Sequence, residues 1–142
     1  MLFRSFTKDG DPIPLLKESL SNLIKICYQY GPILRAVSDA APMHDQLEKA
    51  WALFVKNFND AVTQQIERQQ ALGLIKPFDA RPVATALKLM DADLVRHHFG
   101  RLPRGNQISV LDAILRVWVA TLYGDNGLNT CFSEEITSIN LK

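Results

Sequence analysis

The stretch VLDAILRVWVATLYGDNG, residues 110–127, decides the fold because its apolar residues leave no continuous polar side. Among residues 110–123, the polar interruptions are Asp112, Arg116 and Thr121. A helix at the surface of a small soluble domain normally has one polar side. The stretch therefore predicts a helix with apolar contacts on both flanks. It lies either wholly inside one subunit or between the core of one subunit and a second copy.

Apolar residues recur at steps of three and four through the first half of the chain, which is the spacing of one helix face. This spacing predicts a helix from Leu15 to about Tyr30, ended by Gly31–Pro32, and a short helix from Ile33 to Ala40. The clearest pattern runs from His44 to about Leu72 and predicts one long amphipathic helix. Its apolar positions are Leu47, Trp51, Phe54, Phe58, Val62 and Ile66.

Two further helices are predicted in the second half of the chain. Asp79 suits the N-cap of a fourth helix, and Gly100 with the following loop ends it. Asn106 or Ser109 opens the fifth helix, and Gly124 closes it. The tail adds one more turn from Ser133. The sequence thus predicts an all-α bundle of about five to six helices.

Composition and charge are those of a single soluble domain of 142 residues, with 47% apolar and 22% charged residues. The net charge is +1, whereas a module that binds DNA phosphates by itself normally has a marked excess of basic residues. The N-terminus does not resemble a secretory signal, and no apolar run is long enough to span a membrane. Cys27 and Cys131 belong to no ligand-spaced motif, so we expect free thiols in a cytoplasmic protein.

Catalysis requires an activated nucleophile, a tuned acid–base pair or a metal. The histidines are His44, His97 and His98, and the adjacent pair points in different directions on a helix, which is poor geometry for chelation. The Ser133–Glu135 segment suits a helix cap rather than a catalytic triad, and no glycine-rich phosphate loop is present. We therefore expect a protein that is not an enzyme, with no metal and no cofactor.

A basic cluster follows the predicted fourth helix and comprises Arg96, His97, His98, Arg101 and Arg104. It suits either contact with nucleic acid or the favourable placement of cations at a helix C-terminus. Because no aromatic residues interleave with it to stack bases, the second interpretation is favoured.

An aromatic stripe of Trp51, Phe54 and Phe58 either fills the core or lines a tunnel along the long helix. Asp91 lies on or beside an apolar face of the fourth helix, where a carboxylate needs solvent, a partner or a ligand. Trp118 needs a partner for its indole N–H if it is buried, and either Asp91 or a ligand supplies one.

Three phrases resemble a known family. They are LEKAWALFVKNFNDAVTQQIERQQALG (47–73), ATALKLMDADLV (84–95) and VLDAILRVWVATLYGDN (110–126). They are similar to the C-terminal domain of TetR-family transcriptional repressors, most of all to the branch that includes the mycobacterial ethionamide-activation repressor. The resemblance covers about residues 28–126 and is weak in the N-terminal segment and after Gly127.

The resemblance implies a homodimer in which the last two large helices, residues 84–99 and 106–123, meet the same helices of a second copy. The expected interface residues are Leu111, Leu115, Val119 and Leu122. Members of the family open with a DNA-binding helix-turn-helix, which has no counterpart here. We therefore expect an effector-binding and dimerisation domain over 1–127 with its DNA-reading head absent, followed by a tail over 128–142 with a short helix.

The resemblance also implies a ligand tunnel. The matching positions are Trp51, Val55, Phe58, Ala61, Val62, Lys88, Asp91, Val95 and Trp118, and the residue pattern adds Phe54, Leu87 and Met90. Lys88 and Asp91 replace amides of the relative, which implies a more polar or charged ligand within an apolar or amphipathic class. Ala61 replaces a larger residue and widens the space.

The function implied is that of a small-molecule effector domain of a TetR-type repressor, whose ligand alters DNA binding of the intact protein. DNA would be reached only through the missing helix-turn-helix domain. The alternative is a stand-alone helical small-molecule carrier or protein-interaction module without a DNA role.

Overall fold

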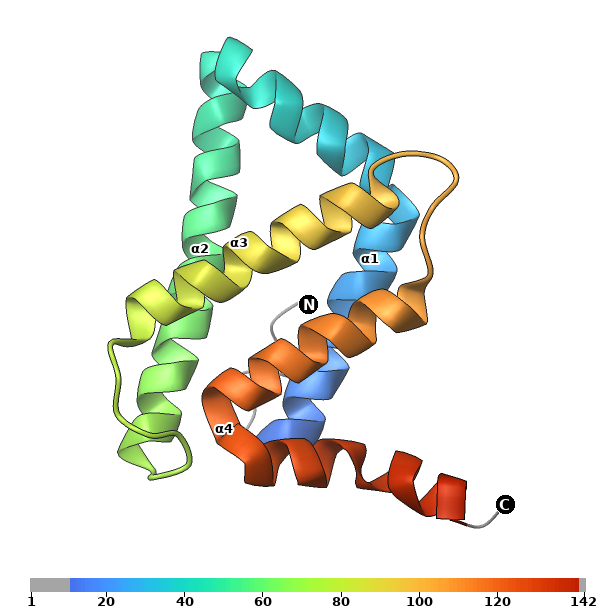
Figure 1. Cartoon of the computed structure of the whole chain (residues 1–142). Helices are drawn as coiled ribbons and strands as arrows, with labels where there is room; N and C mark the ends of the chain where they lie inside the picture. Colours follow the sequence, from blue (N-terminus) through green and yellow to red (C-terminus); the bar gives the residue numbers. More distant parts are fainter. Residues whose placement is uncertain (1–10, 141–142) are drawn as a thin grey trace.

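The computed structural model describes the backbone of residues 11–140 and the side chains of residues 11–132. Over this part of the chain the fold is entirely helical, as the sequence predicted, with four α-helices rather than five or six (Figure 1). The elements are α1 (Pro12–Ala40), the 3₁₀ turn η1 (Ala41–Met43), α2 (Asp45–Ala71), α3 (Ala80–Phe99) and α4 (Gln107–Asn140).

Helix α1 combines the two helices predicted before and after Gly31–Pro32. The Asp11 side chain accepts a hydrogen bond from the backbone N–H of Ile13 at 3.1 Å and caps the start of the helix. Pro32 removes one helical N–H but does not end the helix, and α1 changes direction part-way along in Figure 1. The predicted break is therefore a bend.

Helices α2 and α3 begin and end within a few residues of the predicted positions. Asp79 occupies the predicted N-cap position of α3, although its side chain makes no capping hydrogen bond. The two helices are joined by a hydrogen bond of 3.0 Å from Asn59 to the Thr85 hydroxyl and by an ion pair of 2.9 Å between Asp60 and Arg81. The crossing point of α2 and α3 is therefore fixed by polar contacts as well as by packing.

Helix α4 begins where the sequence placed its cap, because the Asn106 side chain accepts a hydrogen bond from the Ser109 N–H at 3.0 Å. Gly124 interrupts the helix where the sequence predicted its end, because it adopts the non-helical angles φ 66° and ψ −160°. A second helical run of α4 follows it as far as Asn140. The single turn predicted from Ser133 is thus part of a longer helical segment. A positive φ is accessible to glycine at little cost, which explains a sharp bend at this position.

The core lies where the first part of α1 (before Pro32), the second half of α2, α3 and the first part of α4 (before Gly124) meet. The residues of α1 from Pro32 onward form its second part. Helix α4 contributes its most buried residues, which are Val110, Ile114, Leu115, Trp118, Val119 and Leu122. Opposite them lie Leu16, Leu20, Ile24 and Cys27 of α1 and Ile66 of α2. The stretch that decided the fold therefore fills the centre of the subunit with one of its flanks. No helix in the described part of the chain is long and apolar enough to cross a membrane.

Candidate ligand site and subunit surface

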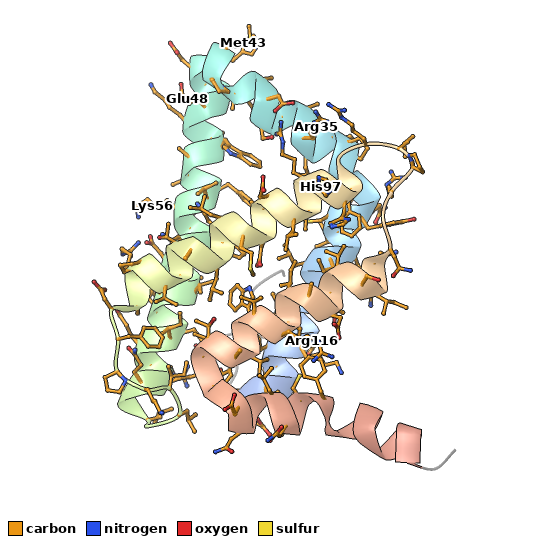
Figure 2. The ribbon with its side chains drawn as sticks, in the orientation of Figure 1. Arg35, Met43, Glu48, Lys56, His97 and Arg116 are labelled. Carbon is orange, nitrogen blue, oxygen red and sulfur yellow. The ribbon has the colours of Figure 1, made fainter. Side chains whose placement is uncertain are left out.

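The two halves of α2 are packed very differently. Every buried residue of α2 belongs to its second half, from Val62 onward, whereas residues 45–61 include no buried side chain. The first half nevertheless has an apolar side, and its polar residues Glu48 and Lys56 lie on the outward side in Figure 2. An apolar helix side without full cover is therefore the distinguishing feature of this region.

The uncovered side of α2 borders a three-sided arrangement of helices. The second part of α1, α2 and α3 form its sides in Figure 1, and side chains project between them in Figure 2. On α2, Trp51 and Phe54 are stacked, with ring centroids 5.7 Å apart. Phe54 is half exposed, at 51%, so this aromatic pair is not part of the closed core.

The residues predicted to contact a ligand occupy a gradient from core to surface. The buried members are Val62, Leu87, Asp91 and Trp118. The half-buried members are Trp51, Val55, Phe58, Ala61, Lys88, Met90 and Val95, and Phe54 is exposed. Phe58, Met90 and Val95 pack against the core cluster from its edge. The predicted set thus lies where the closed core gives way to the uncovered side of α2, and its role in ligand binding stays a prediction.

Asp91 and Trp118 form a buried polar contact between α3 and α4. The Trp118 indole N–H donates to both oxygens of the Asp91 carboxylate, at 2.9 and 3.1 Å. Both side chains are almost fully buried, with 4% and 2% of their surface exposed. Of the two partners that the sequence allowed for the indole, the structure shows Asp91.

The environment of Asp91 favours its neutral form. Burial raises the pKa of the Asp91 carboxyl to about 7, and the Trp118 N–H opposes part of this shift. On α1, burial together with the nearby Asp91 charge raises the pKa of the Cys27 thiol to about 11. A thiol with so high a pKa is a poor nucleophile at neutral pH, so Cys27 acts here as a small core residue.

A second buried polar contact, between α4 and α2, was not foreseen from the sequence. The Tyr123 hydroxyl donates to the Gln69 side-chain oxygen, and burial raises the Tyr123 pKa. Gln69 stands in the run Gln64–Gln70, which has the composition of a solvated face. Only its helical phase, three residues after Ile66, could have indicated an inward direction. Among the described residues, no group of three or more His, Cys, Asp or Glu side chains could hold a metal ion.

The residues predicted for the dimer interface lie mostly inside the subunit. Leu115, Val119 and Leu122 are 2%, 0% and 4% exposed, and Leu111 is partly buried against the same core. Three of these four side chains are therefore core residues, with no surface open to a second copy in this conformation. The exposed flank of α4 is formed by other residues, among them Ala113, Val117, Ala120 and Thr121.

A family model described as "Transcriptional regulator EthR, C-terminal domain" matches residues 16–124, from the first turn of α1 to the bend of α4. This chain belongs to the EthR C-terminal domain family. The family places it among the C-terminal domains of TetR-type regulators, which serve in effector binding and dimerisation. The match covers well over half of the chain, including both buried polar contacts. No curated protein sequence matches the chain.

The raised pKa of Asp91 predicts that the free energy of unfolding falls as pH rises. The folded state retains the Asp91 proton up to a pH of about 7, whereas the unfolded chain loses it near the usual aspartate pKa of 3.8. Between these values the folded state binds more protons, so each pH unit lowers stability by at most about 1.4 kcal/mol. Urea unfolding between about pH 5 and about pH 8 measures this slope.

The Asp91→Asn variant keeps an acceptor for the Trp118 N–H but cannot titrate, so its stability is expected to change little over the same pH range. The exposed Glu67→Gln variant is the control and retains the wild-type slope. Equal slopes for the wild type and Asp91→Asn would show that this carboxyl does not titrate as its surroundings require.

Proposed function

We propose that the chain is the effector-binding and dimerisation unit of a TetR-type repressor, in which a small apolar or amphipathic molecule binds between the first half of α2 and α3. The observation that carries the proposal is the uncovered apolar side of residues 45–61, on a helix that packs against α3, the helix of the buried Asp91. The family match supports the class of function. Residues 1–127 form the proposed unit, with 128–142 as its extension.

A ligand at this position would bury the apolar side chains that the subunit leaves half-covered. Each 100 Å² of apolar surface removed from water contributes roughly 2.5 kcal/mol. Lys88 and Asp91 lie one helical turn apart on α3, and a polar end of the ligand would bind there. Ligand pockets generally combine a mostly apolar lining with a few polar groups that fix the orientation of the ligand.

A ligand bound between α2 and α3 would affect DNA binding by changing how two subunits are arranged. Helix α3 contacts α4, and both helices have an uncovered flank with small or apolar side chains: Ala86, Leu89 and Ala92 on α3, and Ala113, Val117 and Ala120 on α4. The two helices lie side by side across α1 and α2 in Figure 1. Small side chains allow helices of two copies to pack closely in an isologous, two-fold interface.

The regulatory step follows from such a dimer. Two DNA-reading heads must lie about 34 Å apart to enter successive major grooves. A ligand that binds one arrangement of the dimer more tightly than another shifts the population toward it, by no more than its difference in affinity. In the intact repressor this shift would change DNA binding.

The ligand site is tested by thermal unfolding with a panel of aryl amides and medium-chain acyl amides. A bound member raises the unfolding temperature, with about 2.7 kcal/mol of stabilisation at a hundredfold excess over Kd. Trp51→Ala and Phe58→Ala are each expected to reduce this shift to near zero, compared with the temperature of the same variant without ligand. Glu48→Ala, on the outward side of the same helix, retains it. A shift that survives both aromatic substitutions would place the binding elsewhere.

The subunit surface is tested by analytical ultracentrifugation at micromolar concentration, where the proposed dimer has twice the chain mass of 16.0 kDa. Ala120→Asp places a charge on the exposed flank of α4 without touching the core and is expected to weaken dimerisation about tenfold or more. Gln64→Asp, exposed on α2, introduces the same charge away from this flank and leaves the dimer intact. A wild-type species at the chain mass alone would contradict the proposed dimer.

A further inference from the structure

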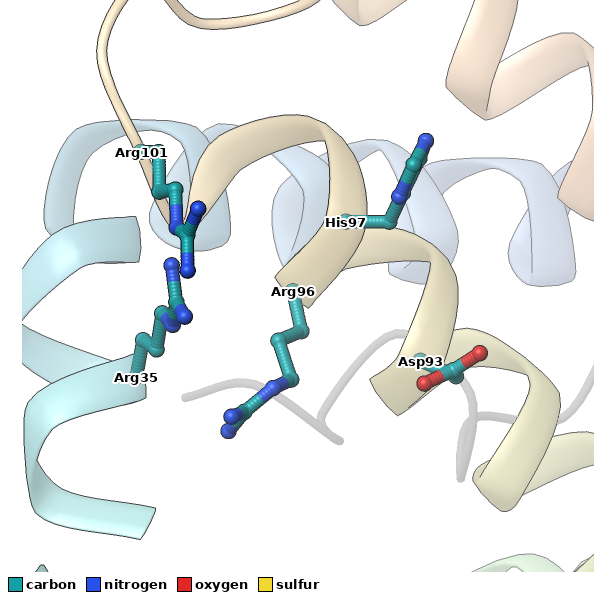
Figure 3. A pocket seen from close by; sticks show the side chains of 5 residues that line it. All are labelled: Arg35, Asp93, Arg96, His97 and Arg101. Carbon is teal, nitrogen blue, oxygen red and sulfur yellow. The ribbon is translucent and has the colours of Figure 1, made fainter. Parts of the chain in front are cut away.

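A pocket of about 370 Å³ lies at the junction of the second part of α1 and the C-terminal end of α3 (Figure 3). It is lined by Arg35, Asp93, Arg96, His97 and Arg101. It shares no residue with the proposed ligand set, and Asp93 and Arg96 continue toward the C-terminus the side of α3 that has Leu89 and Ala92. Four of its five lining side chains are arginine or histidine, so basic residues are concentrated here in a chain whose net charge is only +1.

Two of the three arginines are held in place by neighbouring groups. One Arg96 nitrogen lies 2.5 Å from the Asp39 carboxylate, and another donates to the Ser38 hydroxyl at 3.0 Å. The Nε of Arg35 lies 3.7 Å from the other oxygen of Asp39. Asp39 is thus one carboxylate beside two guanidinium groups, and it holds Arg96 closely and Arg35 only through a longer contact.

The third arginine leaves the pocket with an excess of positive charge. In the part of the chain whose side chains are described, Arg101 has no ion pair. Figure 3 shows its guanidinium end turned toward that of Arg35, whereas Asp93 and His97 lie on the other side of Arg96. Like charges that face each other are unfavourable unless an anion separates them.

Placement at a helix C-terminus explains only part of this cluster. Arg96, His97 and Arg101 lie in or just after the last turn of α3, where cations are favoured by the helix dipole. Arg35 belongs to α1, and its side chain packs so near Gly100 that a Cβ there would lie 3.0 Å from the Arg35 Cδ. The pocket therefore depends on the tertiary contact of two helices, which the dipole does not require.

We propose that this arginine pocket, formed by Arg35, Arg96 and Arg101, binds a small doubly charged oxyanion of the phosphate class, free or as a phosphate monoester. Guanidinium groups bind such oxygens through pairs of parallel hydrogen bonds. The facing ends of Arg35 and Arg101 offer two such groups, with Arg96 beside them (Figure 3). The volume accommodates a phosphate together with a small organic group. A bound anion would link the second part of α1 to the end of α3.

The chemistry of the pocket favours a small anion over a nucleic acid. Duplex DNA is bound by a row of cations that follows its phosphates. The remaining arginine of this region, Arg104, stacks over the Tyr28 ring at 5.3 Å instead of extending the arginine pocket. The positive charge is therefore concentrated in one pocket and does not form a stripe.

The experiment is a titration of the ¹⁵N-labelled full chain with inorganic phosphate at about pH 7.5, where the dianion is the main form of phosphate. Saturable shifts of the amide signals of residues 35–39 and 96–101 are expected. Sodium chloride of equal ionic strength produces no saturable shift. Arg101→Gln weakens the affinity about tenfold or more, because one set of charge-assisted hydrogen bonds is lost. Lys49→Gln, which removes the same charge far away on α2, stays within about twofold.

A parallel titration with glycerol 3-phosphate distinguishes the source of the anion. Tighter binding of the ester than of phosphate assigns the pocket to phosphorylated small molecules, and equal binding assigns it to the free ion. Arg101 is exposed, and a circular dichroism spectrum checks that its variant remains folded. Shifts that chloride reproduces, equal affinity of wild type and Arg101→Gln, or Arg101-dependent binding of duplex DNA in preference to phosphate would each overturn the proposal.

Discussion

The packing of α4 against α1 is the constraint on which the rest of the structure depends. The inward flank of α4 contributes Trp118, Ile114 and Val119, each at most 2% exposed, to a core shared with α1 and the second half of α2. Helix α1 packs against α4 and α3 and approaches α2 mainly at the turn η1, so it does not cover the first half of α2. The first half of α2 is consequently left beside α3 with its apolar side half-covered. Close packing in one half of the domain thus produces the opening in the other half.

Asp91 connects these two halves. A carboxylate that is 4% exposed, with a single indole N–H donating to it, has a large cost of ionisation. A hydrophobic residue of similar size would avoid that cost, so the carboxylate is not explained by stability alone. In the proposed effector site, Asp91 would serve as a hydrogen-bond acceptor for the polar end of an otherwise apolar ligand. The same contact joins α3 to α4, the two helices of the proposed subunit surface.

The sequence predicted the helices well where periodicity was strong and their ends less well where glycine or proline intervened. Residues 45–71 and 80–99 follow from their apolar spacing, and Asn106 caps α4 as expected. Gly31–Pro32 signalled an end but produces a bend inside α1, so tertiary contacts overrode the local signal there. Gly124 does end the first helical run of α4, and the sequence missed that a second run begins directly after it.

The inward flank of α4 was hard to choose from spacing, since apolar residues occur on both flanks. Leu115, Val119 and Leu122 face inward, whereas the outward flank has the smaller Ala113 and Ala120. The polar residues of the stretch, Asp112, Arg116 and Thr121, are partly or fully exposed on the outward side, so side-chain size and polarity together distinguish the flanks. The Asp91–Trp118 pair was among the sequence alternatives because each residue needed a polar partner on an apolar face. Arg35 was missed because it comes from α1, far in sequence from the other arginines of its pocket.

Native-state hydrogen exchange of backbone amides tests the uneven packing of the domain most directly, because it measures the free energy of opening segment by segment. Amides of residues 47–60 in α2 are expected to exchange through local opening, with protection well below that of residues 64–70 and of residues 112–122 in α4. Protection that is uniform along α2 and equal to that of α4 would contradict this uneven packing, since the first half of α2 would then belong to the same closed core.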